Sequence, residues 1–173
     1  MHCPSCHQTL KSNEYEGVEI EICPGCGGEW LDADELGKIV RRREVRFDES
    51  ACRGMAETKP IEGVPTEAFE RVLICPKCGG KTQPINYGGD SGIILDRCGG
   101  CGGFWLDAEE LERVQMIVEG WDDRLPEVMR ELGPELQQVE AENRHVGEAQ
   151  VSHLPVVGRF INALVNRLAR LSD

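Results

Sequence analysis

Two similar segments decide the fold: residues 23–36 read CPGCGGEWLDADEL, and residues 98–111 read CGGCGGFWLDAEEL. Each opens with a C-x-x-C pair and continues into a tryptophan, an aspartate and a glutamate at matching positions. Another C-x-x-C pair precedes each segment, beginning at Cys3 and at Cys75. The chain therefore contains an internal repeat in which each copy carries two cysteine pairs.

The spacing of the cysteines is that of a structural zinc site. The first copy reads C-x2-C-x16-C-x2-C and the second reads C-x2-C-x19-C-x2-C. A pair separated by two residues lets both thiolates reach one ion, and the stretch between pairs is long enough for a β-hairpin that brings them together. The eight predicted ligands, four for each of two Zn²⁺ ions, are Cys3, Cys6, Cys23, Cys26, Cys75, Cys78, Cys98 and Cys101.

Iron and disulfide bonds are the alternatives to zinc. A rubredoxin-type iron site also uses four thiolates, but its pairs usually lie farther apart and aromatic residues surround the iron, whereas aromatic residues make up only 5% of this chain. Disulfides require an oxidising compartment. The sequence shows no signal peptide and no apolar run of the ~18 residues that a membrane span needs. We therefore expect zinc, a cytoplasmic location and no transmembrane segment.

Two histidines and the ninth cysteine are expected to lie outside the metal sites. His2 and His7 flank the first cysteine pair, and we expect both to lie outside a shell that already has four thiolates. The ninth cysteine, Cys52, has no second cysteine near it in sequence, and we expect a free thiol.

Each copy continues with residues expected to complete a small core and to begin a helix. Trp30 and Trp105 follow the last cysteine of each copy by four residues, and we expect each indole to pack over the metal site or the hairpin. Asp32 and Asp107 are each followed three residues later by a glutamate, the spacing of an N-cap and its capping-box partner. Apolar residues at helical spacing follow, so a short helix is predicted after each ribbon.

This organisation predicts a small metal-stabilised α+β fold, with two tandem zinc ribbons (each a β-hairpin plus a short helix) and a C-terminal helical tail. The predicted divisions are ribbon 1 with its helix at 1–46, a linker at 47–70, ribbon 2 with its helix at 71–119, and the helical tail at 120–173. Pro126, Gly133 and Pro134 are expected to break the first part of the tail into short helices.

The two copies also resemble a known family. A CPxC pair, a gap and then C-P-G-C-G-G-x-W-L-D-x-x-E-L is similar to the bacterial zinc-ribbon family named after the zinc finger of transcription factor IIB. Both copies match, over residues 3–36 and 75–111, although Gly99 stands where the pattern has proline. The resemblance implies one zinc ion in each four-cysteine set, and the family name suggests transcription.

The charge of the chain bears on nucleic-acid binding. Its formal net charge is −12, so the chain as a whole is repelled by phosphate backbones. A local basic cluster is formed by Arg41, Arg42, Arg43 and Arg46. These arginines could contact phosphates, or they could be cations placed favourably at a helix C-terminus. The second interpretation is favoured, so nucleic acid is the less expected partner.

Residues 155–171 form the other distinctive feature. At ~100° per residue their apolar side chains gather on one arc of a helix, and Arg159 and Arg170 lie on the opposite side. Such an amphipathic helix could dock on its own chain, pair with a second copy, enter a partner's groove or lie on an anionic membrane surface. Docking within the chain or self-association is the favoured interpretation.

These observations predict a zinc-binding, non-enzymatic protein-interaction module or adaptor, and the family resemblance suggests a role related to transcription. A closed shell of four thiolates leaves no coordination position for a substrate, and the sequence shows no nucleophile–base set and no phosphate-binding loop. A nucleic-acid-binding ribbon protein and a redox or zinc sensor are the alternative hypotheses.

Overall fold

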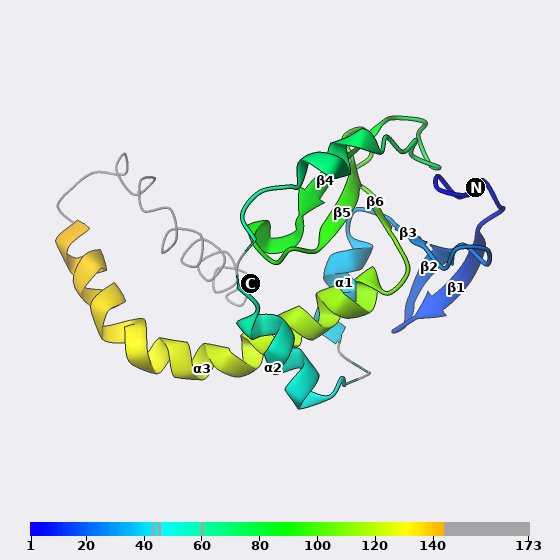
Figure 1. The fold of residues 1–173 in the computed structure, drawn as a ribbon. Coiled ribbons are helices and arrows are strands. Elements are labelled where there is room, and N and C mark those ends of the chain that lie inside the picture. The colour runs from blue at the N-terminus through cyan, green and yellow to red at the C-terminus, as the bar shows by residue number, and fades with distance from the viewer. Residues whose placement is uncertain (43, 45, 60, 144–173) are drawn as a thin grey trace. The chain divides into compact units, whose positions relative to one another are not determined.

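The computed structural model describes residues 1–143 except 43, 45 and 60 (Figure 1). Its elements in chain order are β1 (Lys11–Tyr15), β2 (Val18–Ile22), β3 (Glu29–Leu31), α1 (Glu35–Arg42), α2 (Glu49–Glu57), the 3-10 helix η1 (Thr66–Glu70), β4 (Thr82–Asn86), the 3-10 turn η2 (Tyr87–Gly89), β5 (Ile94–Cys98), β6 (Phe104–Leu106) and α3 (Glu110–Asn143). Each copy thus supplies a hairpin, a short third strand and a helix, which confirms the predicted ribbon architecture.

The first hairpin follows directly from its sequence. Its two-residue turn, Glu16–Gly17, has φ values of 48° and 66°. Positive φ at both positions is what a tight hairpin turn requires. In β2, Val18 and Ile20 alternate with glutamates and are 8% and 0% exposed, so one face of the strand enters the core.

The two ribbons form one sheet rather than two separate domains. The six strands are all antiparallel, in the order β1-β2-β3-β6-β5-β4. The central pair, β3 with β6, joins the copies and places Trp30 opposite Trp105. We call this strand pair the β3–β6 seam. Residues Met1–Arg124 consequently form one compact unit that contains both ribbons.

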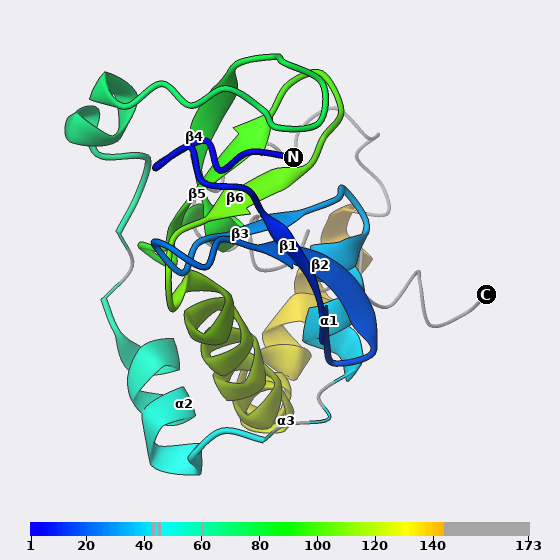
Figure 2. The same cartoon turned by 90° about the vertical axis from the view of Figure 1, so that its right-hand side faces the viewer.

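One face of the sheet is covered by helices. Figure 2 shows the first part of α3 beneath the sheet, with α1 and α2 on either side of it. The buried residues between sheet and helices are Val18, Ile20, Leu31, Leu36, Ile39, Ile93, Leu95, Leu106, Leu111, Val114, Ile117 and Val118. Both copies contribute to this core, so neither ribbon has a separate one.

The segment 47–70, predicted to be a linker, contains two helices. Asp48 caps α2 by accepting a hydrogen bond from the Ala51 N–H, at 3.0 Å. The other side of α2 packs closely on α3, where a β-carbon added at Gly120 would lie only 2.2 Å from the Cys52 carbonyl oxygen. The absence of a side chain at Gly120 therefore lets the two helices approach and buries Cys52.

The predicted breaks at Pro126, Gly133 and Pro134 are wrong, because α3 continues through all three positions to Asn143. A proline inside a helix loses one N–H donor and crowds the preceding turn. The surrounding sequence is nevertheless rich in strong helix formers such as Glu, Leu, Gln, Arg and Met. A second compact unit begins at Leu125. The predicted amphipathic helix 155–171 lies outside the described residues, and none of the helices described is long and apolar enough to cross a bilayer.

Candidate metal centres

Each copy brings its four cysteines together. Within each set the four Sγ atoms lie within 4.8 Å of one another, and the two sets are those predicted from the spacing: Cys3, Cys6, Cys23 and Cys26, and Cys75, Cys78, Cys98 and Cys101. Neither set includes a histidine, so His2 and His7 lie outside both.

The distances between sulfur atoms fit zinc. Cys3 Sγ lies 3.6 Å from Cys26 Sγ, and Cys6 Sγ lies 3.3 Å from Cys23 Sγ. The corresponding distances in the second copy are 3.6 and 3.4 Å. Ligands ~2.3 Å from a tetrahedral Zn²⁺ ion lie about 3.8 Å from one another, whereas a disulfide would bring two sulfurs to about 2.05 Å. The two clusters therefore fit one zinc ion each and contain no disulfide.

All four cysteine pairs share one backbone turn. The residue after the second cysteine has positive φ in every case: 65° at His7, 74° at Gly27 and Gly79, and 77° at Gly102. Its N–H donates to the carbonyl oxygen of the first cysteine of the pair, at 2.9–3.0 Å. Glycine adopts this conformation without strain, so His7 is the exception among the four turns.

Backbone N–H groups also point at the sulfur atoms. The N–H groups of Ser5 and Cys6 donate to Cys3 Sγ at 3.3 Å, and those of Lys77 and Cys78 donate to Cys75 Sγ at 3.4 Å. These hydrogen bonds hold the sulfur of the first cysteine against the turn of its own pair. The first cysteine of every pair is buried, and the second lies nearer the surface.

The two tryptophans are buried, but each contacts the other copy of the repeat. Trp30 and Trp105 are 0% and 1% exposed. A β-carbon added at Gly28 would lie 2.3 Å from Cζ2 of Trp105, and one added at Gly103 would lie 2.5 Å from Cζ2 of Trp30. Each indole therefore lies against the turn that follows the other copy's last cysteine. The sequence predicted burial within a ribbon, and the exchange between ribbons arises from the β3–β6 seam.

The aspartates and glutamates of the repeat support helix α1 or α3. The side chain of Glu35 accepts from the N–H of Asp32 at 2.7 Å, as one half of a capping box does. Glu110 accepts equivalently from the N–H of Asp107 at 2.8 Å. The predicted capping glutamates are thus confirmed in both copies.

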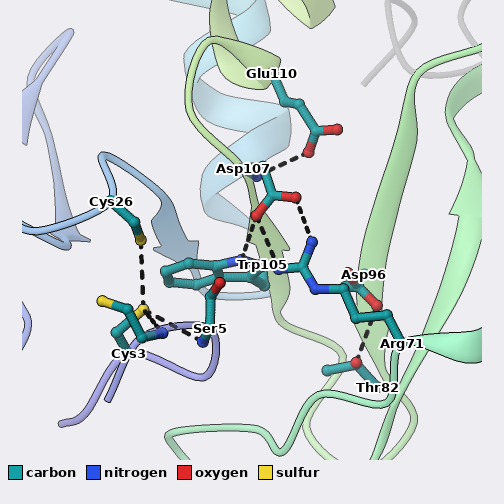
Figure 3. Close-up of polar contacts among 10 residues, drawn as sticks. Cys3, Ser5, Cys26, Arg71, Thr82, Asp96, Trp105, Asp107 and Glu110 are labelled. Carbon is teal, nitrogen blue, oxygen red and sulfur yellow. Dashed lines mark hydrogen bonds and ion pairs between the residues drawn. The ribbon is translucent and has the colours of Figure 1, made fainter. Parts of the chain in front are cut away.

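The aspartate side chains bind cations that the sequence pattern did not reveal. Asp107 accepts two hydrogen bonds from the guanidinium of Arg71 and one from Nε1 of Trp105, as Figure 3 shows. The hydrogen bonds from Arg71 hold the pKa of Asp107 below its ordinary value. In the first copy Asp32 pairs with Lys77, which belongs to the second copy. Arg71 and Lys77 lie far from their partners in sequence, so no local spacing indicated these pairs.

A buried carboxylate next to the seam was also missed. Glu29 is 9% exposed, and its Oε2 has no hydrogen-bond partner among the described residues. Burial, together with the negative charge of Glu112, raises the pKa of Glu29 to about 7. At the matching position of the second copy stands Phe104, whose ring lies 5.8 Å from the guanidinium carbon of Arg97.

Of the remaining predicted residues, Arg42 and Cys52 have contacts within the described structure. Arg42 donates to the Glu16 carbonyl at 2.9 Å and so holds the first hairpin turn. Arg41 and Arg46 are exposed, and Arg43 is not described. Cys52 is 1% exposed and lies 3.6 Å from a carboxylate oxygen of Glu119. Burial raises the pKa of the Cys52 thiol, and the Glu119 charge raises it further, which keeps this cysteine in its less reactive form.

Comparison with known families identifies the repeat. The zinc-ribbon family described as "Transcription factor zinc-finger" matches residues 2–42 and again residues 74–115. The chain carries two tandem copies of this zinc ribbon. Searches of curated proteins and of solved structures gave no match. The family match and the two four-cysteine clusters together make the protein a zinc-binding module with two Zn²⁺ sites.

Proposed function

We propose that this tandem zinc ribbon is a non-catalytic cytoplasmic module that binds another protein, in a role connected with transcription. The description of the matching family supports the connection with transcription. Eight thiolates that must stay reduced to bind zinc support a reducing compartment.

The observation that carries the proposal is an exposed apolar segment just before the second ribbon. Phe69, Val72 and Ile74 are 56%, 57% and 50% exposed, while Leu73 between the last two is 5% exposed. Val72 and Ile74 stand two residues apart on either side of buried Leu73, so they face away from the core. We call Phe69, Val72 and Ile74 the 69–74 stripe. Contiguous exposed apolar surface is typical of protein-binding sites, and these three side chains lie close together in sequence.

The second ribbon holds this segment in place. Arg71 is bound to Asp107, and the Leu73 carbonyl accepts from the Thr82 N–H at 3.0 Å. Ile74 forms an isolated antiparallel bridge with Lys81. A partner would therefore meet side chains that are already positioned, which lowers the entropy lost on binding.

The thiolates and carboxylates shared by the two copies have structural roles, which supports a non-catalytic function. Four thiolates complete a tetrahedral zinc shell and leave no open position for water or substrate. The glutamates of each copy cap α1 or α3, and the aspartates pair with Lys77 and Arg71. The groups that the two copies share are thus accounted for by folding.

The test is affinity capture with a matched control. Changing Phe69→Ser, Val72→Thr and Ile74→Thr together should abolish capture of the partner that wild type retains from native lysate. The control variant Glu67→Gln with Lys81→Gln alters exposed polar residues near the same segment and should retain the partner. Zinc content of about two ions per chain in both variants shows that the ribbons are intact. Equal capture by all three proteins would refute a role for the stripe.

A chain lacking residues 155–173 tests the amphipathic segment separately. If that segment supplies a second contact or self-association, its removal lowers capture or the mass of the protein in solution. Unchanged capture and unchanged mass would leave the 69–74 stripe as the proposed binding surface.

A further inference from the structure

The two zinc sites share one buried cluster. It contains the two tryptophans of the repeat, two cysteines from each site, and two leucines: Cys3, Cys23, Cys75, Cys98, Trp30, Trp105, Leu10 and Leu73. This cluster lies on the face of the seam opposite the helices, because Trp30 alternates along β3 with Leu31, which belongs to the helix-covered core. Ligands of both ions are therefore packed in the same small core.

The contact between the copies reaches the metal ligands through the backbone. The carbonyl of Gly28 accepts from the N–H of Cys23 at 2.8 Å, and Trp105 lies against Gly28. Likewise the carbonyl of Gly103 accepts from the N–H of Cys98 at 2.8 Å, and Trp30 lies against Gly103. Each indole thus contacts a peptide group that fixes a ligand cysteine of the other site.

We propose that the two zinc sites are energetically coupled through Trp30 and Trp105, so that the protein binds and releases its two ions cooperatively. The inference does not depend on the proposed protein-binding function. Zinc binding fixes the turns of a ribbon, since most of the binding free energy of a small metal domain is folding free energy. A zinc-loaded ribbon presents an ordered turn on which the other copy's tryptophan can pack. Part of the second ribbon is then already ordered, so binding of the second ion loses less conformational entropy.

Further contacts support the same coupling. The seam pairs residues 29, 30 and 31 with residues 106, 105 and 104. Lys77, between two ligands of the second site, forms its ion pair with Asp32 of the first copy. Couplings between sites in one protein usually change affinity about 5- to 150-fold, and we expect about tenfold here.

Native mass spectrometry of the intact chain measures the coupling directly, because it counts the ions on each molecule. With zinc supplied at one ion per chain, cooperative binding yields mainly apo and two-zinc species. Two independent and equal sites would place about half of the molecules in the one-zinc state, and independent unequal sites would place more there. A one-zinc fraction of half or more in the wild type would overturn the proposal.

Replacing the two glycines that the indoles contact with alanine tests whether these contacts carry the coupling. Neither Gly28 nor Gly103 has positive φ, so Gly28→Ala with Gly103→Ala keeps all eight cysteines in the sequence. The added methyl groups press on the indoles and on the seam carbonyl oxygens of Leu106 and Leu31. The one-zinc species should rise to about half or more in this variant. Gly99→Ala is the matched control, because Gly99 lies in the same turn region, has no positive φ and has no atom within 4 Å of an added β-carbon. It should behave as wild type. A wild-type distribution in the Gly28→Ala, Gly103→Ala protein would exclude the tryptophan contacts as the route.

Removing one ion by mutation gives a second measurement that is independent of those glycines. Cys6→Ser with Cys26→Ser removes two surface ligands of the first site and leaves buried Cys3 and Cys23 unchanged. Chelator competition should then show the second site binding zinc about tenfold more weakly than the intact chain binds its second ion. Cys78→Ser with Cys101→Ser should weaken the first site by the same factor, because coupling is reciprocal. Unchanged affinity at the remaining site in both variants would refute coupling.

Discussion

The two zinc ribbons have the same cysteine geometry but different surroundings. The first has a two-residue hairpin turn and an eight-residue helix, α1. The second has a longer turn whose Tyr87 stacks on Trp121 of α3, with ring centroids 6.4 Å apart and planes 5° apart. Arg71 also holds the start of α3 through Asp107. The residues common to both copies thus build the metal sites and the seam, while residues found in the second copy alone attach it to the long helix.

The largest effect is expected where the copies are most alike, at the two tryptophans. Trp30→Ala and Trp105→Ala each empty a fully buried site and should lower the free energy of unfolding by about 3–5 kcal/mol. Urea unfolding in excess zinc measures this. Phenylalanine should separate the two copies, because Trp105 Nε1 donates to Asp107 at 3.0 Å whereas Trp30 Nε1 has no partner among the described residues. Trp105→Phe should therefore cost more than Trp30→Phe, and the reverse order would contradict the assigned contacts.

The next effect concerns the cations that bind the two aspartates. Arg71 forms a bidentate ion pair with half-buried Asp107, so Arg71→Met should lower the free energy of unfolding by about 1 kcal/mol. Lys77→Met removes an ion pair exposed to solvent and should cost less. Unfolding in low and high salt provides the check, because screening should weaken the contribution of Lys77 more strongly. Equal losses of unfolding free energy in the two variants would show that the bidentate geometry adds no stability.

The copies also differ at Glu29 and Phe104, and this difference predicts a dependence on pH. Burial first, and then the charge of Glu112, raises the pKa of Glu29 from 4.5 to about 7 in the folded protein. The stability associated with its protonated form is complete below about 4.5 and is lost as pH rises through about 7. As pH rises through this range, the free energy of unfolding of Glu29→Gln should therefore increase relative to that of wild type. The expected increase is about 1–2 kcal/mol after allowing for partial solvation of the carboxyl group.

Chemical unfolding of both proteins at each pH between about 5.5 and 8, in excess zinc, gives this difference. Taking the difference at each pH cancels the pH dependence of zinc binding that both proteins share. Glu14→Gln, on the exposed strand β1, is the control and should show no such gain. If the difference in stability between Glu29→Gln and wild type does not change with pH, other groups must stabilise the Glu29 carboxylate in the folded state.

The sequence predicted what depends on short-range spacing and could not predict what depends on pairing between copies. The grouping of the eight cysteines and the capping glutamates follow from local patterns, and the structure shows both. The seam could not be predicted, because a three-residue strand such as Glu29–Leu31 has no periodicity that indicates its partner. The prolines of the tail do not end the helix, because α3 continues through Pro126 and Pro134. Arg71 and Gly120 acquire their roles only through residues distant in sequence.

The smallest effect is expected at His7, which occupies the position that glycine takes in the other three cysteine turns. Its φ of 65° costs a non-glycine residue about 1–2 kcal/mol, part of which glycine loses again through the greater freedom of its unfolded chain. His7→Gly should therefore raise the free energy of unfolding by about 0.5–1 kcal/mol. Gly79→Ala should lower it by a similar amount, since Gly79 has a φ of 74° and no neighbour within 4 Å of an added β-carbon. A loss of stability or of zinc at the first site in the His7→Gly protein would mean that the imidazole itself supports that site, and the two copies would then differ at the metal as well as around it.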